Sequence, residues 1–67
     1  MANEVMRQNR IRTILNDVPK RKILRRVFVA KESLEHGISA RTIDDYLMTL
    51  IDAGRVKFEN GMVWKDA

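Results

Sequence analysis

The stretch that decides the fold is residues 37–64, which read GISARTIDDYLMTLIDAGRVKFENGMVW. It opens with the turn Gly37-Ile38-Ser39, and Ser39 is a favourable helix N-cap because its hydroxyl can accept a hydrogen bond from an unpaired N–H of the first turn. Apolar residues then recur at the three- and four-residue spacing of one buried helix face: Ile43, Leu47, Leu50 and Ile51. The pattern predicts a helix over about 40–53 whose opposite side is free.

A β-hairpin is predicted directly after this helix. Gly54 can take the left-handed conformation that commonly ends a helix, and polar and apolar residues alternate from there to about residue 65. Asn60-Gly61 interrupts the alternation, and both residues tolerate the positive φ angles of a two-residue type I′ turn. This turn places Phe58 opposite Val63 and Lys57 opposite Trp64, in a hairpin spanning about 55–65.

Residues 37–56 resemble the winged helix-turn-helix family. The resemblance is carried by a G-[IV]-S turn, an R-T pair, an aliphatic residue, a Y-L pair and a closing L-x-x-A-G. It covers residues 37–65 closely and the rest of the chain loosely, and it is nearest to the short stand-alone regulators of archaea, phages and plasmids. It implies a mainly α fold with a small β-hairpin, in which three helices carry a two- or three-stranded wing. It also implies binding of double-stranded DNA, as a transcriptional regulator or a DNA-organising protein.

The first half of the chain predicts two further helices. A helical stripe at Ile11, Ile14, Leu15 and Val18 predicts a helix over about 3–16, which ends before Pro19. By the family pattern, Ile23-Leu24 then bridges to the wing and the second helix spans about 26–36. The alternative is a helix that begins near Pro19, a favoured residue at the first helical position. We prefer the family pattern; in both versions Phe28 and Leu34 fill the space between helices, and Gly37 ends the second one.

Length and composition favour a small binding module over an enzyme. A chain of 67 residues allows one domain with a core near the lower limit for independent folding. No nucleophile lies beside a suitable base, and no glycine-rich phosphate loop occurs, so we expect no catalysis. The absence of cysteine excludes disulfides and thiolate metal sites. His36 has no convincingly spaced carboxylate partner, so we expect a histidine close to helix-end carbonyls, with no metal and no cofactor.

The same composition predicts where the protein works. No apolar run approaches the roughly 18 residues of a membrane span, and the N-terminus is too polar for a signal peptide. We therefore expect no membrane association and a cytoplasmic, nucleoid-associated location.

Positive charge is concentrated in the first half of the chain. Residues 1–31 carry nine Lys or Arg against two acidic residues, whereas residues 32–67 carry four against seven. The densest part is the basic segment, which we define as five residues: Lys20, Arg21, Lys22, Arg25 and Arg26. Such a cluster attracts phosphate and releases counterions from DNA, although on an arbitrary protein it more often only solvates the surface. Beside a recognition-helix pattern, we interpret it as a phosphate-binding cluster.

The resemblance places the third helix in the major groove and the wing on the flanking backbone. The implied contacts from the helix are Ser39, Ala40, Arg41, Thr42, Asp45, Tyr46 and Thr49, and those from the wing are Arg55, Lys57 and Lys65. Arg41 can hydrogen-bond a guanine edge or a phosphate. Tyr46 can instead pack its ring under the second helix, and the wing cations can instead protect an edge strand.

Two aspartates, Asp44 and Asp45, oppose this interpretation because carboxylates near the groove repel phosphate. Asp45 lies four residues after Arg41 and can neutralise it, or can accept from a cytosine amino group. We therefore expect binding to be led by the basic segment and the wing.

The alternative function is a winged-helix module that binds protein in a replication, transcription or segregation assembly, through the acidic helix face and an exposed Trp64. We prefer DNA. A DNA-binding module of this size is expected to act as a homodimer, with Val5 and Met6 the first candidates for the contact.

Overall fold

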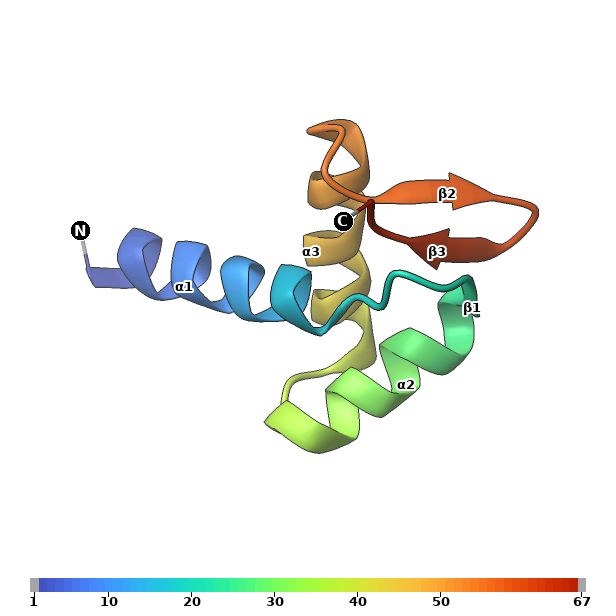
Figure 1. The fold of residues 1–67 in the computed structure, drawn as a ribbon. Helices are drawn as coiled ribbons and strands as arrows, with labels where there is room; N and C mark the ends of the chain where they lie inside the picture. Colours follow the sequence, from blue (N-terminus) through green and yellow to red (C-terminus); the bar gives the residue numbers. More distant parts are fainter. Residues whose placement is uncertain (1, 67) are drawn as a thin grey trace.

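The computed structural model describes residues 2–66, and in that part of the chain three helices pack with one three-stranded antiparallel sheet (Figure 1). The elements in chain order are α1 (Ala2–Asp17), β1 (Ile23–Leu24), α2 (Arg25–His36), α3 (Ala40–Asp52), β2 (Lys57–Glu59) and β3 (Met62–Trp64). The spatial order of the strands is β1-β3-β2. This small, mainly helical arrangement is consistent with a winged-helix layout.

Helix α3 begins and ends as its sequence predicts. The hydroxyl oxygen of Ser39 accepts a hydrogen bond from the backbone N–H of Thr42 at 3.2 Å, which satisfies one donor of the first turn. At the other end Gly54 has φ +77°, and its N–H donates to the carbonyl of Ile51 while Arg55 N–H donates to the carbonyl of Leu50. These two bonds form a Schellman motif, which explains why the helix stops there.

Helix α2 follows the family pattern, and a helix that begins near Pro19 is wrong. The segment 18–22 has no helical turn, and its Pro19 carbonyl accepts a hydrogen bond from the N–H of Lys65 at 3.0 Å. Ile23-Leu24 pairs with β3 as strand β1, and α2 begins at Arg25, whose N–H donates to the carbonyl of Gly61. The residues that precede α2 therefore hydrogen-bond to the β2–β3 hairpin instead of forming a helix.

Strands β2 and β3 form a hairpin at the place expected for the wing, in the register that Asn60-Gly61 predicts. Lys57 pairs with Trp64 and Phe58 with Val63. Asn60 has φ +53° and Gly61 φ +76°, the pair of positive angles that a type I′ turn requires. Because Ile23 pairs with Val63 on the other edge, β3 lies in the middle of the sheet.

The core lies where the three helices and the sheet meet. Its buried apolar side chains are Ile14, Val18, Phe28, Val29, Ile43, Tyr46, Leu47, Leu50, Val56 and Val63. Leu34 was expected to join them, but its side chain is 87% exposed. It lies on the outer side of α2, because the inward face of that helix is set by Phe28, Val29 and Glu32. Spacing alone could not separate these two faces.

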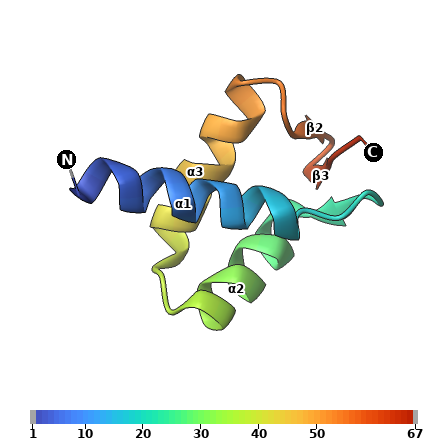
Figure 2. The same cartoon turned by 60° about the vertical axis from the view of Figure 1, so that its left-hand side comes forward.

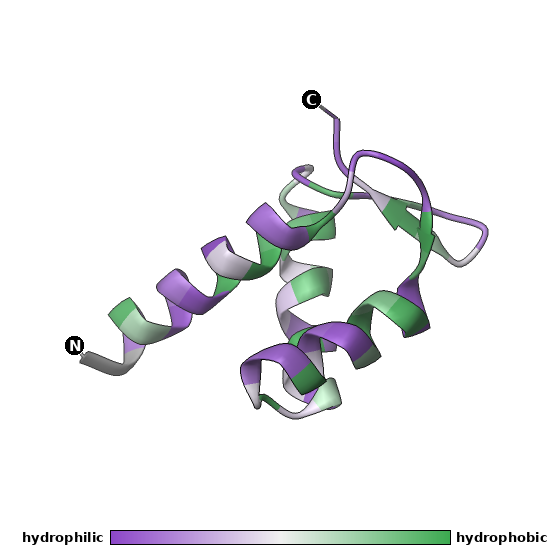
Figure 3. Ribbon diagram, turned by 60° about the horizontal axis from the view of Figure 1, so that its bottom comes forward, coloured by the Kyte–Doolittle hydropathy of each residue, from purple (hydrophilic) through white to green (hydrophobic). Residues whose placement is uncertain are grey.

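Helix α1 is packed at its C-terminal half and projects at its N-terminal half (Figure 3). The packed end is held by Lys65, whose Nζ donates to the carbonyls of Leu15 at 2.9 Å and Asn16 at 3.0 Å. A cation at this position satisfies helix-end carbonyls and interacts favourably with the negative end of the helix dipole. The projecting half exposes Val5 and Met6. Within residues 2–66, no helix combines the length and apolar character that crossing a membrane requires.

Candidate functional site

One side of α3 faces away from the protein. We call it the α3 face and define it by four exposed residues: Arg41, Asp45, Met48 and Asp52. They recur at the spacing of one helix side, opposite the buried residues Ile43, Leu47 and Leu50 of the same helix. The helix is therefore held by one side only, and its other side is open.

The structure corrects the expected place of Tyr46. This residue is only 6% exposed and belongs to the core cluster, so its ring is not on the open side of α3. The cause is helical periodicity, because Tyr46 lies next to Leu47 and one turn after Ile43, both fully buried.

The hydroxyl groups of Ser39 and Thr42, at the start of α3, are linked to each other. Ser39 Oγ donates to Thr42 Oγ1 at 2.9 Å while it accepts from Thr42 N–H. Thr42 Oγ1 therefore keeps its own proton available for an outside acceptor, whereas the proton of Ser39 is already used. Thr49 Oγ1 donates to the carbonyl of Asp45 at 3.1 Å, so its proton is also used. Of the three hydroxyls, Thr42 is the donor best placed to meet a ligand.

The two aspartates that oppose DNA binding have different surroundings. Asp44 forms an ion pair and hydrogen bond with Arg25 of α2, both side chains being partly exposed. Asp45 does not pair with Arg41: among residues 2–66 no ion pair joins them. One carboxylate is therefore neutralised from another helix, and the charge of Arg41 stays available.

The structure divides the basic segment. Arg25 contacts α3 through Asp44, and Arg26 is exposed beside it in the first turn of α2. Arg21 and Lys22 instead line a hollow of about 250 Å³ on the side of α2 that faces the end of α1. Lys22 also lies over the ring of Trp64, 4.7 Å from its centroid. Figure 2 shows the link between α1 and β1 well separated from the first turn of α3.

A second hollow brings two arginines to the other edge of α3. It lies between α1 and α3, and its lining includes Arg12, Arg55 and Thr49. Arg55 was expected to contact DNA from the wing, whereas Arg12 was not among the expected contacts. The available signal was its position one residue after Ile11 in α1, at the border of the stripe that packs against α3.

The wing cations do not form one surface. Lys57 is exposed, with its Nζ 3.5 Å from a carboxylate oxygen of Asp66. The ammonium group of Lys65 donates to the last carbonyls of α1, so it is already engaged within the fold. Trp64 is half-buried beneath Lys22 rather than fully exposed.

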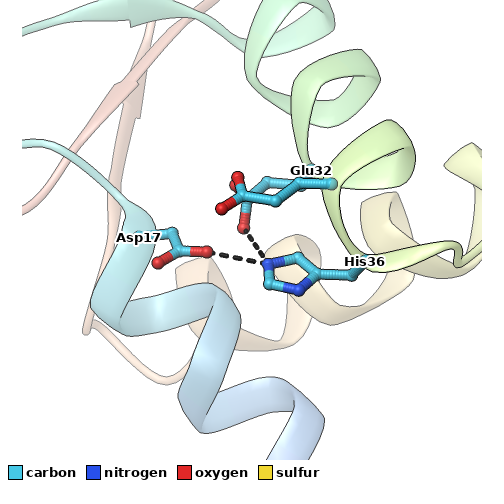
Figure 4. Close-up of side chains that lie close together, drawn as sticks. Asp17, Glu32 and His36 are labelled. Atoms are coloured by element: carbon cyan, nitrogen blue, oxygen red, sulfur yellow. Dashed lines mark hydrogen bonds and ion pairs between the residues drawn. The ribbon is translucent and has the colours of Figure 1, made fainter.

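A cluster of acidic residues surrounds His36, contrary to the expectation that it has no carboxylate partner. Its Nε2 lies 2.9 Å from Oδ2 of Asp17, at the end of α1, and 3.4 Å from Oε1 of Glu32 one turn earlier in α2 (Figure 4). Glu32 is fully buried, and neither of its carboxylate oxygens has a hydrogen-bond partner. Asp17 and His36 are 19 residues apart, so their contact depends on the packing of α1 against α2. The spacing of residues in the sequence therefore could not predict it.

Each of the three groups has a shifted pKa. Burial, and then the neighbouring Asp17 carboxylate, raise the pKa of Glu32 to about 7. The hydrogen bond to Asp17 raises the pKa of His36 above its usual value. Burial alone would raise the pKa of Asp17, but the neighbouring Glu32 and His36 outweigh it and the pKa is lowered. The arrangement therefore favours an ionised Asp17 with a protonated His36, and disfavours a charged Glu32.

Comparisons of the chain with protein-family models, with curated proteins and with solved structures found no match.

Proposed function

We propose that the protein is a winged helix-turn-helix module that binds double-stranded DNA, as a transcriptional regulator or a DNA-organising protein. In this proposal the α3 face enters the major groove, and cations beside it bind the phosphates that border the groove. The three-residue turn between α2 and α3, and the wing that follows α3, support this fold assignment.

The observation that carries the proposal is the placement of arginines along both edges of an open helix. Arg12 and Arg55 lie at the edge of α3 that faces α1. Arg25 lies at the opposite edge with Arg26 beside it. Phosphates border the major groove on both sides, so a helix in the groove requires cations at both of its edges. We call Arg12, Arg26 and Arg55 the flanking arginines. Arg25 is left out of this group because it is already paired with Asp44.

Four residues on or beside the α3 face then have a defined role. Arg41 points outward without an ion-pair partner among the described residues, and its guanidinium can donate two hydrogen bonds to a guanine edge. Thr42 has a free hydroxyl proton for a phosphate near the helix N-terminus. Asp45 can accept from a cytosine amino group. Arg25 reduces phosphate repulsion by neutralising Asp44.

Lys20, Arg21 and Lys22 are separated from α3, so the proposal assigns them a different role from the flanking arginines. With a duplex seated on the α3 face, these three cations attract DNA at a distance rather than contact it, and salt screens such attraction beyond about 8–10 Å. Phosphate contacts therefore come from the flanking arginines.

Two triple variants of equal charge test this assignment. In one variant Arg12, Arg26 and Arg55 are replaced by Ala, and in the other Lys20, Arg21 and Lys22 are replaced by Ala. All six side chains are exposed, so both variants are expected to fold, which circular dichroism checks. Binding of a labelled random-sequence duplex is then measured by fluorescence anisotropy across a salt series.

For the unmodified chain, log affinity should fall with log salt at a slope of about −3, as expected for three phosphate contacts. Replacement of the flanking arginines should bring the slope close to zero, whereas replacement of residues 20–22 should change it by less than about one. The opposite result would move the phosphate contacts to the basic segment and contradict the proposed surface.

Binding of a protein partner is the second candidate, favoured by the chemistry of the α3 face itself. That face carries Asp45 and Asp52 against Arg41, with Met48 41% exposed between them. Acidic residues around an exposed apolar side chain suit a basic protein surface better than phosphate. The two triple variants separate the two functions, because a protein-binding module should not lose duplex affinity selectively when the flanking arginines are replaced.

A further inference from the structure

Donor atoms for a metal ion converge where the end of α1 meets the end of α2. Asp17, Glu32, Glu35 and His36 each offer one ligand atom, and these four atoms lie within 4.8 Å of one another. Figure 4 shows the Asp17, Glu32 and His36 side chains pointing toward a common centre from the two helices. Ligand atoms about 2.1 Å from a tetrahedral ion are separated by about 3.4 Å. His36 Nε2 is already 2.9 Å from Asp17 and 3.4 Å from Glu32, and a pair at the 4.8 Å limit would have to close by about 1.4 Å.

The state of Glu32 points independently to a bound cation. Its side chain is 0% exposed, and both oxygens lack a hydrogen-bond partner. An ionised carboxylate that is buried without a partner costs several kcal/mol, so the metal-free protein favours the protonated form of Glu32, and a bound cation would remove that cost. The neighbouring imidazole satisfies it poorly, because His36 Nε2 is closer to Asp17 at 2.9 Å than to Glu32 at 3.4 Å. A cation at the centre of the cluster would satisfy Glu32 and Asp17 together.

We propose that Asp17, Glu32 and His36 bind a divalent first-row transition metal ion of the Zn²⁺ type, with Glu35 as a fourth ligand at the exposed side. The donor set selects this class of ion. An imidazole nitrogen suits Zn²⁺, Co²⁺ or Ni²⁺, whereas Mg²⁺ and Ca²⁺ prefer oxygen ligands alone and six or more of them. Four donors in a compact group match the tetrahedral coordination of Zn²⁺.

The metal would join two helices that the chain connects only through residues 18–24. Asp17 is the last residue of α1, and Glu32 and His36 lie in the last turns of α2. Because the ligands come together only in the folded protein, metal binding adds directly to folding stability. The ion would fix α1 against the helix that precedes α3, and this effect does not depend on DNA binding.

The test uses the full chain without a histidine tag, freed of metal by chelation. Thermal unfolding is followed by circular dichroism at neutral pH with and without 100 µM Zn²⁺, and with Mg²⁺ as an ion control. Co²⁺ is added separately, because four-coordinate Co²⁺ gives an intense visible absorption that octahedral aqueous Co²⁺ lacks. The variants are Glu32→Gln and His36→Gln, with Glu59→Gln on the wing as a matched control. Glu32→Gln is expected to fold because the amide removes a buried charge and keeps its size.

Zn²⁺ should raise the unfolding temperature of the unmodified chain and of Glu59→Gln by about 5 °C or more, as expected for a dissociation constant of about 10 µM or less. Mg²⁺ should produce no shift. Glu32→Gln and His36→Gln should lose both the Zn²⁺ shift and the Co²⁺ absorption. The proposal is overturned if the unmodified chain shows neither signal, or if folded Glu32→Gln responds as the unmodified chain does. Neither readout involves DNA, so its failure leaves the proposed DNA surface unaffected.

Discussion

Replacement of the buried Glu32 by Gln should stabilise the metal-free protein at alkaline pH. The pKa of Glu32 is raised to about 7 in the folded protein from an ordinary value of 4.5. The folded state therefore holds a proton that the unfolded chain releases between these two pH values, so stability falls as pH rises through this window. Above pH 7 the folded state pays the full free-energy cost of ionising the buried Glu32, and below about pH 4.5 this cost disappears.

The size of the effect follows from the pKa difference. One pKa unit corresponds to about 1.4 kcal/mol, so the penalty at pH 8 is at most about 3 kcal/mol, and at pH 5 it is under about 1 kcal/mol. Gln occupies the same volume without charge, and its amide can donate to the carboxylate of Asp17. We expect Glu32→Gln to gain about 2 kcal/mol at pH 8, or about 10 °C in unfolding temperature for a chain of this size.

The assay is thermal unfolding by circular dichroism at pH 8 and at pH 5, with a chelator present throughout. The unmodified chain is compared with Glu32→Gln at each pH, which removes the contributions that both proteins share. A gain that is as large at pH 5 as at pH 8 would show that the buried charge is not its cause. A loss of stability at pH 8 would refute the reasoning, because it would mean that the charged carboxylate is well satisfied without metal.

Three further outcomes are expected. Lys65→Met should lower the free energy of unfolding by about 1–2 kcal/mol in urea titrations, because it leaves the last carbonyls of α1 without their cation. An unchanged free energy of unfolding would show that these hydrogen bonds do not stabilise the fold. Phe28→Ala should cost about 3–5 kcal/mol while Leu34→Ala stays within about 0.5 kcal/mol, because one side chain is buried and the other is 87% exposed; equal costs would contradict the assigned faces of α2. Sedimentation at micromolar concentration should detect the homodimer expected for a module of this size, and Val5→Asp should weaken it; a protein that stays monomeric and binds DNA as single copies would contradict that expectation.

The parts of the fold set by neighbouring residues could be predicted from the sequence. Ser39 supplies the N-cap of α3, and Gly54 supplies the left-handed residue at its end. Asn60-Gly61 fixes both the turn and the strand register, because few residue pairs allow two successive positive φ angles. In each case the cause and its structural result lie within a few residues of each other.

The parts that depend on packing could not be predicted in the same way. Arg25 neutralises Asp44 across 19 residues, and Lys65 binds α1 across 50. Asp17 reaches His36 only because α1 and α2 meet at their ends. In the candidate site, the sequence identified the outward residue Arg41 but not the place of Arg12 beside Thr49 and Arg55. The spacing of residues along one helix does not determine the angle at which a second helix packs against it.

The most direct test of the proposed DNA surface is an NMR titration of the ¹⁵N-labelled chain with a short duplex at low salt. Amide shifts that concentrate in residues 39–52 and extend to Arg12, Arg26 and Arg55 would agree with a duplex seated on α3. Shifts confined to residues 19–24, or no shifts at all, would contradict it.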